Sequence, residues 1–258
     1  MTSQETRTPE EKEYVAGLEK GLAIIEAFGI HNKPLTLSEA AQITGHSRAS
    51  ARRSLLTLQA LGYVQSDGKH FRLAPRALRL GHAYVSSTAL LRLMQPVLEG
   101  ISERTRESSS LAVLDSNDVV FLARAATRRS LSTGLGLGSR LPAHGAATGR
   151  VLLAALPPED AALRLKRMAR QQMTPRTQTD VDELLKILAD VRVNGYALCD
   201  EELELGVRSI AVPIQDTGGQ VVASMSIVAS TRRRSLDNVL GSLLPELESA
   251  RRMVGAML

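Results

Sequence analysis

Three consecutive helical patterns followed at once by an alternating segment occupy residues 17–73, and this order restricts the fold more than any other feature of the sequence. The first pattern has apolar residues at helical spacing, at Leu18, Leu22, Ile25 and Phe28. Gly29 follows, and glycine commonly ends a helix. This spacing predicts an amphipathic helix near the start of the chain.

Two further helical patterns lie on either side of a short turn that contains glycine. The first of them has Thr36 or Ser38 as its N-cap and is ended by Gly45. The next begins after Ser47 and is predicted to bury the apolar face formed by Ala51, Leu55, Leu58 and Leu61. Two helices joined in this way predict a helix-turn-helix.

An alternation of apolar and polar residues over residues 63–74 surrounds the pair Asp67-Gly68. This dipeptide between alternating segments is a strong signal for a β-hairpin. The hairpin would form a two-stranded wing directly after the third helix. We therefore expect a winged helix-turn-helix over residues 14–75, preceded by a flexible tail over residues 1–13, which lack apolar periodicity.

The face of the third helix opposite its apolar stripe carries arginines. Steps of about 100° per residue place Ala49, Arg52, Arg53 and Leu56 there, with Arg48 and Ser50 flanking them. An arginine can bond a guanine edge or a phosphate through two N–H groups, as a helix in the major groove requires. An ordinary solvated helix face is the alternative. The predicted DNA-contacting residues are Thr36, Ser38, Ser47, Arg48, Ser50, Arg52, Arg53 and Lys69.

The distribution of charge agrees with a segment that faces phosphates. Nine basic and four acidic side chains fall in residues 14–80, an excess as large as the +5 of the whole chain. The sequence has no run of 18 apolar residues and no signal-peptide pattern, and Cys199 is its single cysteine. We expect a cytoplasmic protein that does not enter a membrane and has no disulfide framework.

A helical pattern over residues 76–93 is expected to link the two parts of the chain. Its apolar residues would offer a stripe to a second copy, at Leu78, Leu80, Tyr84 and Leu90. Operators are usually read by dimers, because two half-sites discriminate far better than one. We expect a homodimer, with a tetramer as a further step.

Residues 94–258 combine helical patterns with alternating strands. Two strands are expected around the turn at Asp115 to Asp118, one strand in residues 131–144, and a hairpin at Thr217 to Gly219. Helical patterns flank these strands and close the chain. Antiparallel strands with helices segregated around them predict an α+β domain that encloses a small ligand.

Catalysis and metal binding find no support in the spacing of reactive residues. His144, Cys199 and Asp200 could supply a nucleophile, a base and an acid, but His144 lies on a segment far from the other two. The five histidines are scattered and there are no paired cysteines, so the sequence predicts no metal site and no cofactor. We expect a regulator, with an enzyme acting on a small acid as the alternative.

A family resemblance is carried by two stretches that follow the winged helix-turn-helix and the linker helix. They are LPAHGAATGRVLLA and GYALCDEELELGVRSIAVPIQDTGGQVVASMSI. In this order they resemble the IclR family of bacterial transcriptional regulators over essentially the whole chain. The segments VAGLEKGLAIIEAFG and LSTGLGLGSRLPAHGAATGRVLLAAL further resemble the branch that responds to protocatechuate or 4-hydroxybenzoate in the β-ketoadipate pathway. The resemblance implies a GAF-like C-terminal domain that binds an aromatic acid. A non-aromatic acid of the glyoxylate or pyruvate type is the alternative.

The same resemblance implies where an effector would bind. It indicates Gly145 and Ala146 in the loop, Cys199 and Asp200 in the second motif, and Ser224 and Ser226 on the last strand. Either Arg124 or Arg150 could pair with a carboxylate directly. The chain departs from many members at two positions, with Gly145 in place of a hydroxyl residue and Arg150 in place of a lysine.

Overall fold

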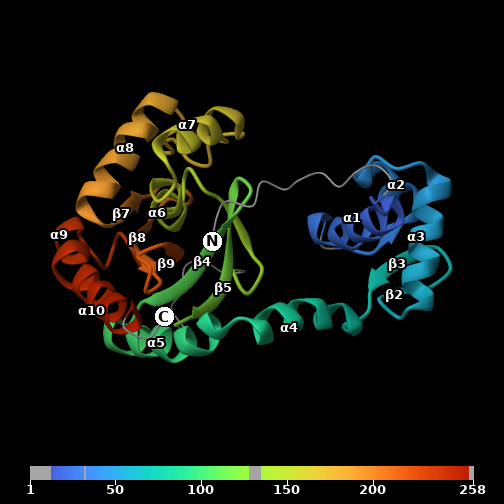
Figure 1. Ribbon diagram of the computed structural model, residues 1–258, viewed down its shortest axis with the longest axis horizontal. Coiled ribbons are helices and arrows are strands. Elements are labelled where there is room, and N and C mark those ends of the chain that lie inside the picture. The colour runs from blue at the N-terminus through green and yellow to red at the C-terminus, as the bar shows by residue number, and fades with distance from the viewer. Residues whose placement is uncertain (1–12, 32, 128–134, 256–258) are drawn as a thin grey trace. The chain divides into compact units, whose positions relative to one another are not determined.

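The computed structural model describes residues 13–31, 33–127 and 135–255 and divides the chain into two compact units, Met1–Tyr84 and Val85–Leu258 (Figure 1). Apart from Glu13, the predicted tail lies outside the described residues, as do residues 131–134 of the strand expected before the loop. The combination of a helical N-terminal unit with a small sheet and a larger α/β unit confirms the predicted α+β class.

The first unit contains the three predicted helices and the predicted hairpin. A short strand that the sequence did not reveal pairs with the second hairpin strand, giving the sheet order β1-β3-β2. The elements are α1 (Ala16–His31), β1 (Leu35–Thr36), α2 (Leu37–Thr44), α3 (Arg48–Ala60), β2 (Val64–Ser66) and β3 (His70–Leu73).

Local hydrogen bonds fix both ends of α2. The Thr36 hydroxyl accepts from the backbone N–H of Glu39, whose carboxylate accepts from the Thr36 N–H at 2.8 Å, so the two residues form a capping box. The hydrogen bond that the Glu39 carboxylate accepts from the Thr36 backbone, followed by those from the Lys33 and Thr36 side chains, lowers the pKa of Glu39 to about 2. Gly45 ends the helix at φ 67°, a left-handed conformation that glycine adopts without strain.

The buried face of α1 differs from the predicted one. Phe28 is buried as expected, but Leu18 and Leu22 are 62% and 46% exposed, and Ile24 and Ala27 enter the core instead. The helix also continues past Gly29 to His31. The buried residues of α1 therefore lie in its second half, and the apolar side chains of Leu18 and Leu22 in its first half stay exposed.

The pattern over residues 76–93 is divided into separate helices rather than one. A 3-10 turn, η1 (Pro75–Ala77), leads into α4 (Leu78–Ser87), and α5 (Ala89–Thr105) begins after Thr88. Thr88 has an extended backbone with φ −106° and ψ 105°, which breaks the helical path. The division between the two units falls inside α4.

An antiparallel sheet with the order β6-β5-β4-β9-β8-β7 forms the centre of the second unit. Both predicted hairpins are present, as the β4–β5 and β8–β9 pairs. The strands are β4 (Ser108–Asp115), β5 (Asp118–Ala125), β6 (Arg140–Pro142), β7 (Ala197–Asp200), β8 (Val207–Gln215) and β9 (Val221–Ser230). The helices are α6 (Ala147–Ala154), α7 (Pro158–Arg167), α8 (Val181–Asn194), α9 (Leu236–Asn238), the π-helical turn η2 (Val239–Leu243) and α10 (Leu244–Gly255).

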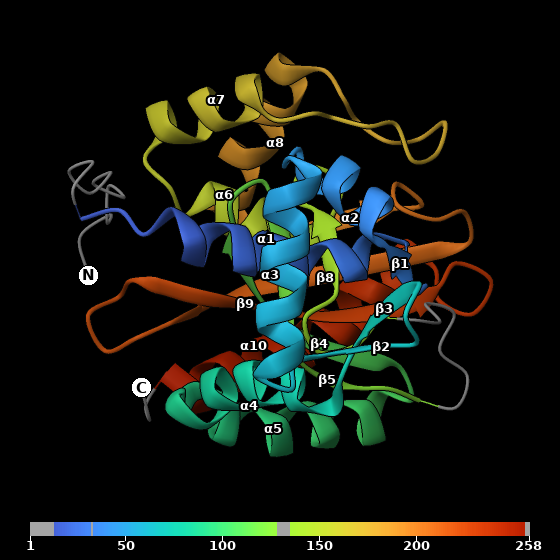
Figure 2. The same cartoon turned by 90° about the vertical axis from the view of Figure 1, so that its right-hand side faces the viewer.

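Helices cover both faces of this sheet (Figure 2). On one face α5 and α10 pack on a core that includes Leu111, Ile210 and Met225, all fully buried. On the other face α6 lies on small residues such as Ala112 and Ala211, with α7 and α8 behind it. Small side chains at these positions let α6 approach the sheet closely. Among the described residues, no helix is long and apolar enough to cross a membrane.

Candidate functional site

The exposed face of α3 carries the predicted arginines. Arg48, Arg52 and Arg53 are all exposed, as is Ala49 between them. Ser50 was predicted to flank this face. It is only 8% exposed and lies toward the core side of α3 instead. The exposed N-terminal half of α3 thus presents three guanidinium groups.

The remaining candidates in the first unit surround α3 at two helix starts and at the hairpin tip. Ser47 caps α3 by accepting from the Ser50 N–H, and the Thr36 hydroxyl is held in the capping box of α2. Ser38 lies exposed in the first turn of α2. Lys69 is exposed at the hairpin tip, where its N–H donates to Asp67 Oδ1 at 2.9 Å.

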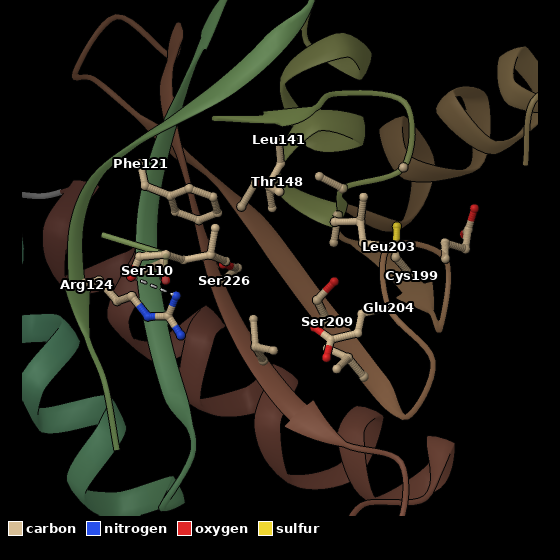
Figure 3. A pocket seen from close by; sticks show the side chains of 17 residues that line it. Ser110, Phe121, Arg124, Leu141, Thr148, Cys199, Leu203, Glu204, Ser209 and Ser226 are labelled. Atoms are coloured by element: carbon tan, nitrogen blue, oxygen red, sulfur yellow. Dashed lines mark hydrogen bonds between the residues drawn. The ribbon is translucent and has the colours of Figure 1, made fainter. Parts of the chain in front are cut away.

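A cavity of about 200 Å³ lies in the second unit between the α6 face of the sheet and the loops around it (Figure 3). An apolar cavity of about 150 Å³ accommodates a benzene ring, so this one has room for a single substituted ring. Its lining is mostly apolar, with a few polar groups, as small-molecule sites usually are. The lining includes Ser110, Phe121, Arg124, Leu141, Gly145, Ala146, Thr148, Cys199, Glu202, Leu203, Glu204, Ser209 and Ser226.

Strand register places a polar row along one side of this cavity. Ser110 on β4 lies directly opposite Arg124 on β5 and, on its other side, opposite Ser226 on β9. Residues paired in this way point to the same face of a sheet. Ser110 and Ser226 are only 1% and 2% exposed, yet among the described residues neither hydroxyl has a hydrogen-bond partner. Both hydroxyls are available to a ligand in the cavity.

Arg124 supplies the positive charge of this row. Its Nη1 donates to the Leu135 carbonyl at 3.3 Å, which holds the side chain beside the cavity. Burial lowers the pKa of the guanidinium from its ordinary value, although an arginine stays charged at neutral pH. A partly buried cation is stabilised by an anion, so Arg124 favours a carboxylate in the cavity.

The loop before α6 forms the opposite wall. Gly145 and Ala146 line the cavity, and no side chain caps the first turn of α6. Its backbone N–H groups can therefore donate to a polar ligand. A Cβ on Gly149, one turn further, would lie 2.2 Å from the Ala143 carbonyl oxygen, so only glycine lets α6 pack on the loop.

Arg150 pairs with a protein carboxylate. The side chain is 2% exposed, and Nη1 and Nη2 donate to Oε1 and Oε2 of Glu202, each at 2.6 Å. Its Nε donates to the His144 carbonyl at 2.9 Å, so α6 is tied both to the loop and to the segment after β7. Arg124 belongs to the cavity lining, whereas Arg150 does not.

Cys199 is unsuited to nucleophilic chemistry. Burial raises the pKa of its thiol to about 12, so the thiol is protonated at neutral pH, whereas the thiolate is the nucleophile. His144 is buried, and its Nε2 lies 3.1 Å from the Gln171 carbonyl rather than beside Cys199. Within the described residues, no three His, Cys, Asp or Glu side chains cluster as metal ligands would.

Two predicted effector residues lie outside the cavity. Asp200 binds Arg208, with 2.7 Å between Oδ1 and Nε, and contributes nothing to the lining. Ser224 is fully buried, with its hydroxyl 3.3 Å from the Val212 carbonyl. The lining residues that sequence reasoning missed include Ser110, Phe121, Thr148, Leu203, Glu204 and Ser209. Regular pairing from the predicted turn would have placed Ser109 opposite Arg124. A register shift between Leu111 and Ala112 brings Ser110 there instead, so the sequence carried no signal for Ser110.

Both units match models of one family. The N-terminal unit matches the IclR helix-turn-helix domain over residues 17–68, and the rest of the chain matches the bacterial transcriptional regulator IclR C-terminal domain over residues 82–255. The chain belongs to the IclR family. It is therefore a DNA-binding transcriptional regulator with an effector domain, and not an enzyme.

Relatives within the IclR family cover nearly the whole chain. It is 40% identical to the Pca regulon regulatory protein of Pseudomonas putida, over 93% of this chain and 83% of that protein. It is 38% identical to the p-hydroxybenzoate hydroxylase transcriptional activator of Acinetobacter baylyi, over 96% of this chain and 92% of that protein.

Solved structures of family members share the fold. A regulator from Rhodococcus sp. RHA1 is 41% identical, with a TM-score of 0.81 over 94% of this chain and 98% of that one. A double mutant of the PobR inducer-binding domain from Acinetobacter, in complex with 3-hydroxybenzoic acid, is 32% identical. Its TM-score is 0.62 over 65% of this chain and 98% of that one.

Proposed function

We propose that this IclR-family regulator binds its operator through α3 and the wing and is controlled by an aromatic carboxylic acid held in the cavity of the second unit. The observation that carries the proposal is the row of Arg124, Ser110 and Ser226, a cation beside two unpartnered buried hydroxyls in a ring-sized cavity. The names of the two relatives, and the acid bound in the related inducer-binding domain, support an effector such as 4-hydroxybenzoate or protocatechuate.

In this proposal the carboxylate binds at Arg124, with the hydroxyls of Ser110 and Ser226 as additional donors. Hydrogen bonds between charged groups are roughly twice as strong as neutral ones, so this end fixes the orientation of the ligand. The ring lies between the apolar walls, which include Phe121, Leu141 and Leu203. Phe121 is the one aromatic side chain among the described residues of this lining, so it alone could stack on the ring. Shape complementarity and apolar contact provide the rest of the binding free energy.

The alternative effector is a small non-aromatic acid such as pyruvate or glyoxylate. Calorimetric titration of the protein with benzoate, 4-hydroxybenzoate, protocatechuate, pyruvate and glyoxylate separates the two. We expect saturable binding of the aromatic acids and weaker binding of the small acids, because these leave most apolar lining uncovered. Tighter binding of pyruvate or glyoxylate would contradict an aromatic effector.

On the DNA side, replacing both Arg52 and Arg53 with alanine should weaken operator binding at least tenfold. Each arginine that reads a base is worth about 1 to 3 kcal/mol. Fluorescence anisotropy with the upstream region of the protein's own gene measures this loss. Arg167→Ala, which removes an exposed arginine from α7, is the control and should bind as the unchanged protein does. Unaltered affinity of the double variant would remove α3 from the interface.

We further propose that the operator is read by a homodimer, with a tetramer as a further step. Exposed apolar side chains on α1 and α4 support a second copy, among them Leu18, Leu22, Leu78 and Tyr84. Control then follows from differential affinity, because an effector that binds one arrangement of the dimer better shifts the population toward it. Residues 76–93 would act as the link between the DNA-binding and effector parts.

A further inference from the structure

The charged groups of the cavity are divided between its two sides. Arg124 lies on β5 at one side, whereas Glu202 and Glu204 lie on the segment between β7 and β8 at the other (Figure 3). Ser209 on β8 also belongs to the second side. A ligand that fills the cavity therefore meets a cation at one end and carboxylates at the other.

Of the two carboxylates, Glu204 is the one available to a ligand. Both oxygens of Glu202 accept from Arg150, and Oε2 also accepts from the Gln178 N–H at 2.9 Å. Among the described residues, no hydrogen bond or ion pair reaches the Glu204 carboxylate, which is exposed at the edge of the cavity. The neighbouring Arg176 binds Glu201 and Asp200 instead.

The separation of the two ends suits one aromatic ring. Arg124 and Ser209 lie on strands that are three positions apart in the order β5-β4-β9-β8. Strands are spaced by about 4.8 Å, so β5 and β8 are about 14 Å apart across the sheet. Ser209 pairs with Val228, so it lies two residues along β8 from the row that contains Arg124. The Arg124 side chain extends into this interval, which leaves a length comparable to a benzene ring with a substituent at each end.

We propose that the Glu204 end of the cavity selects effectors that carry a single carboxylate and, opposite it, a hydrogen-bond donor, and that it rejects dicarboxylates. A phenolic hydroxyl on the far side of the ring donates to the Glu204 carboxylate or to Ser209, a charge-assisted bond in the first case. A second carboxylate in the same position meets Glu204 as a like charge, and the described lining holds no Arg or Lys besides Arg124 to offset it. This selectivity rests on the proposed binding of an aromatic acid with its carboxylate at Arg124.

Three ligands that differ only at the para position test the proposal by calorimetric titration. They are benzoate, 4-hydroxybenzoate and benzene-1,4-dicarboxylate. We expect the unchanged protein to bind 4-hydroxybenzoate most tightly and the dicarboxylate at least about tenfold more weakly than benzoate. Because Glu204 is exposed, solvent screens its charge, which keeps its penalty on dicarboxylate binding moderate.

Two substitutions then change the charge at this end without touching the Arg124 row. Glu204→Gln should remove most of the penalty on the dicarboxylate, so that in this variant the dicarboxylate binds nearly as tightly as benzoate. Glu204→Lys should reverse the ranking, so that the dicarboxylate binds more tightly than 4-hydroxybenzoate, because the second carboxylate then has a cation. Glu159→Gln, an exposed change on α7 outside the cavity lining, is the matched control and should keep the ranking of the unchanged protein.

The outcomes separate this proposal from the one on which it rests. If benzoate and 4-hydroxybenzoate bind but the dicarboxylate binds equally well, or if Glu204→Lys leaves the ranking unchanged, the selectivity proposal is overturned while the aromatic effector stands. If none of the three ligands binds the unchanged protein, both proposals are overturned. Circular dichroism of each variant confirms that the fold is retained, as expected for changes at an exposed side chain.

Discussion

Replacing Gly149 with alanine should strongly destabilise the effector domain. The new Cβ would lie 2.2 Å from the Ala143 carbonyl oxygen and 2.4 Å from its Cα, both of them backbone atoms that cannot rotate away. Either α6 or the loop must move, and overpacking of this kind costs about 3 kcal/mol or more. Thermal unfolding followed by circular dichroism should show a fall in the midpoint of several degrees or loss of the transition.

Gly241 provides the control for this substitution. It lies in the helical segment after α9, and a Cβ there would meet no atom within 4 Å. Gly241→Ala should therefore leave the midpoint unchanged or raise it slightly, since alanine restricts the unfolded chain. Equal stability of the Gly149 and Gly241 variants would show that α6 does not need the close approach to Ala143.

Glu202→Ala should be the second strongly destabilising change, because it leaves the Arg150 guanidinium buried without its counter-charge. Both carboxylate oxygens of Glu202 bind Arg150 at 2.6 Å, and Arg150 is almost inaccessible to solvent. Removing one partner of a buried ion pair costs about 3 to 5 kcal/mol. Urea unfolding of Glu202→Ala and of the unchanged protein measures the difference in their free energies of unfolding.

Two further variants show whether the cost arises from the unpaired charge. The double change Arg150→Met with Glu202→Leu removes both charges and should recover most of the stability, as apolar replacements of buried pairs often do. Arg104→Ala breaks the exposed pair between Arg104 and Glu246 and should cost no more than about 1 kcal/mol. A double variant as unstable as Glu202→Ala would contradict the charge explanation.

The first unit was largely predictable because its signals are local. Helix caps, a glycine turn and the Asp67-Gly68 hairpin each involve residues close in sequence, and the structure has all of them. The errors concern which side of an element is covered. Leu18 and Leu22 fit a helical stripe, yet the core reaches only the second half of α1. The β1 strand has two residues, too few for a pattern of alternation.

The cavity was only partly predictable because its walls come from distant segments. Arg124, Gly145, Ala146, Cys199 and Ser226 were predicted and line it. The ion-pair partner of Arg150 could not be found from the sequence, since Glu202 lies 52 residues further along the chain. Register decides whether a serine faces the cavity. Ser224 pairs with Ala112 in the core that α6 shares, whereas Ser226 pairs with Ser110 in the cavity lining, which is why the two serines differ.

The most direct test of effector control is the operator affinity of the unchanged protein with and without 4-hydroxybenzoate, measured by fluorescence anisotropy beside Arg124→Gln. Coupling between two sites is typically worth 1 to 3 kcal/mol, so the acid should change the operator Kd at least about fivefold. In Arg124→Gln the Kd without acid should be unchanged and the response to acid should be lost. An operator Kd that saturating acid leaves unaltered in the unchanged protein would contradict control through this cavity.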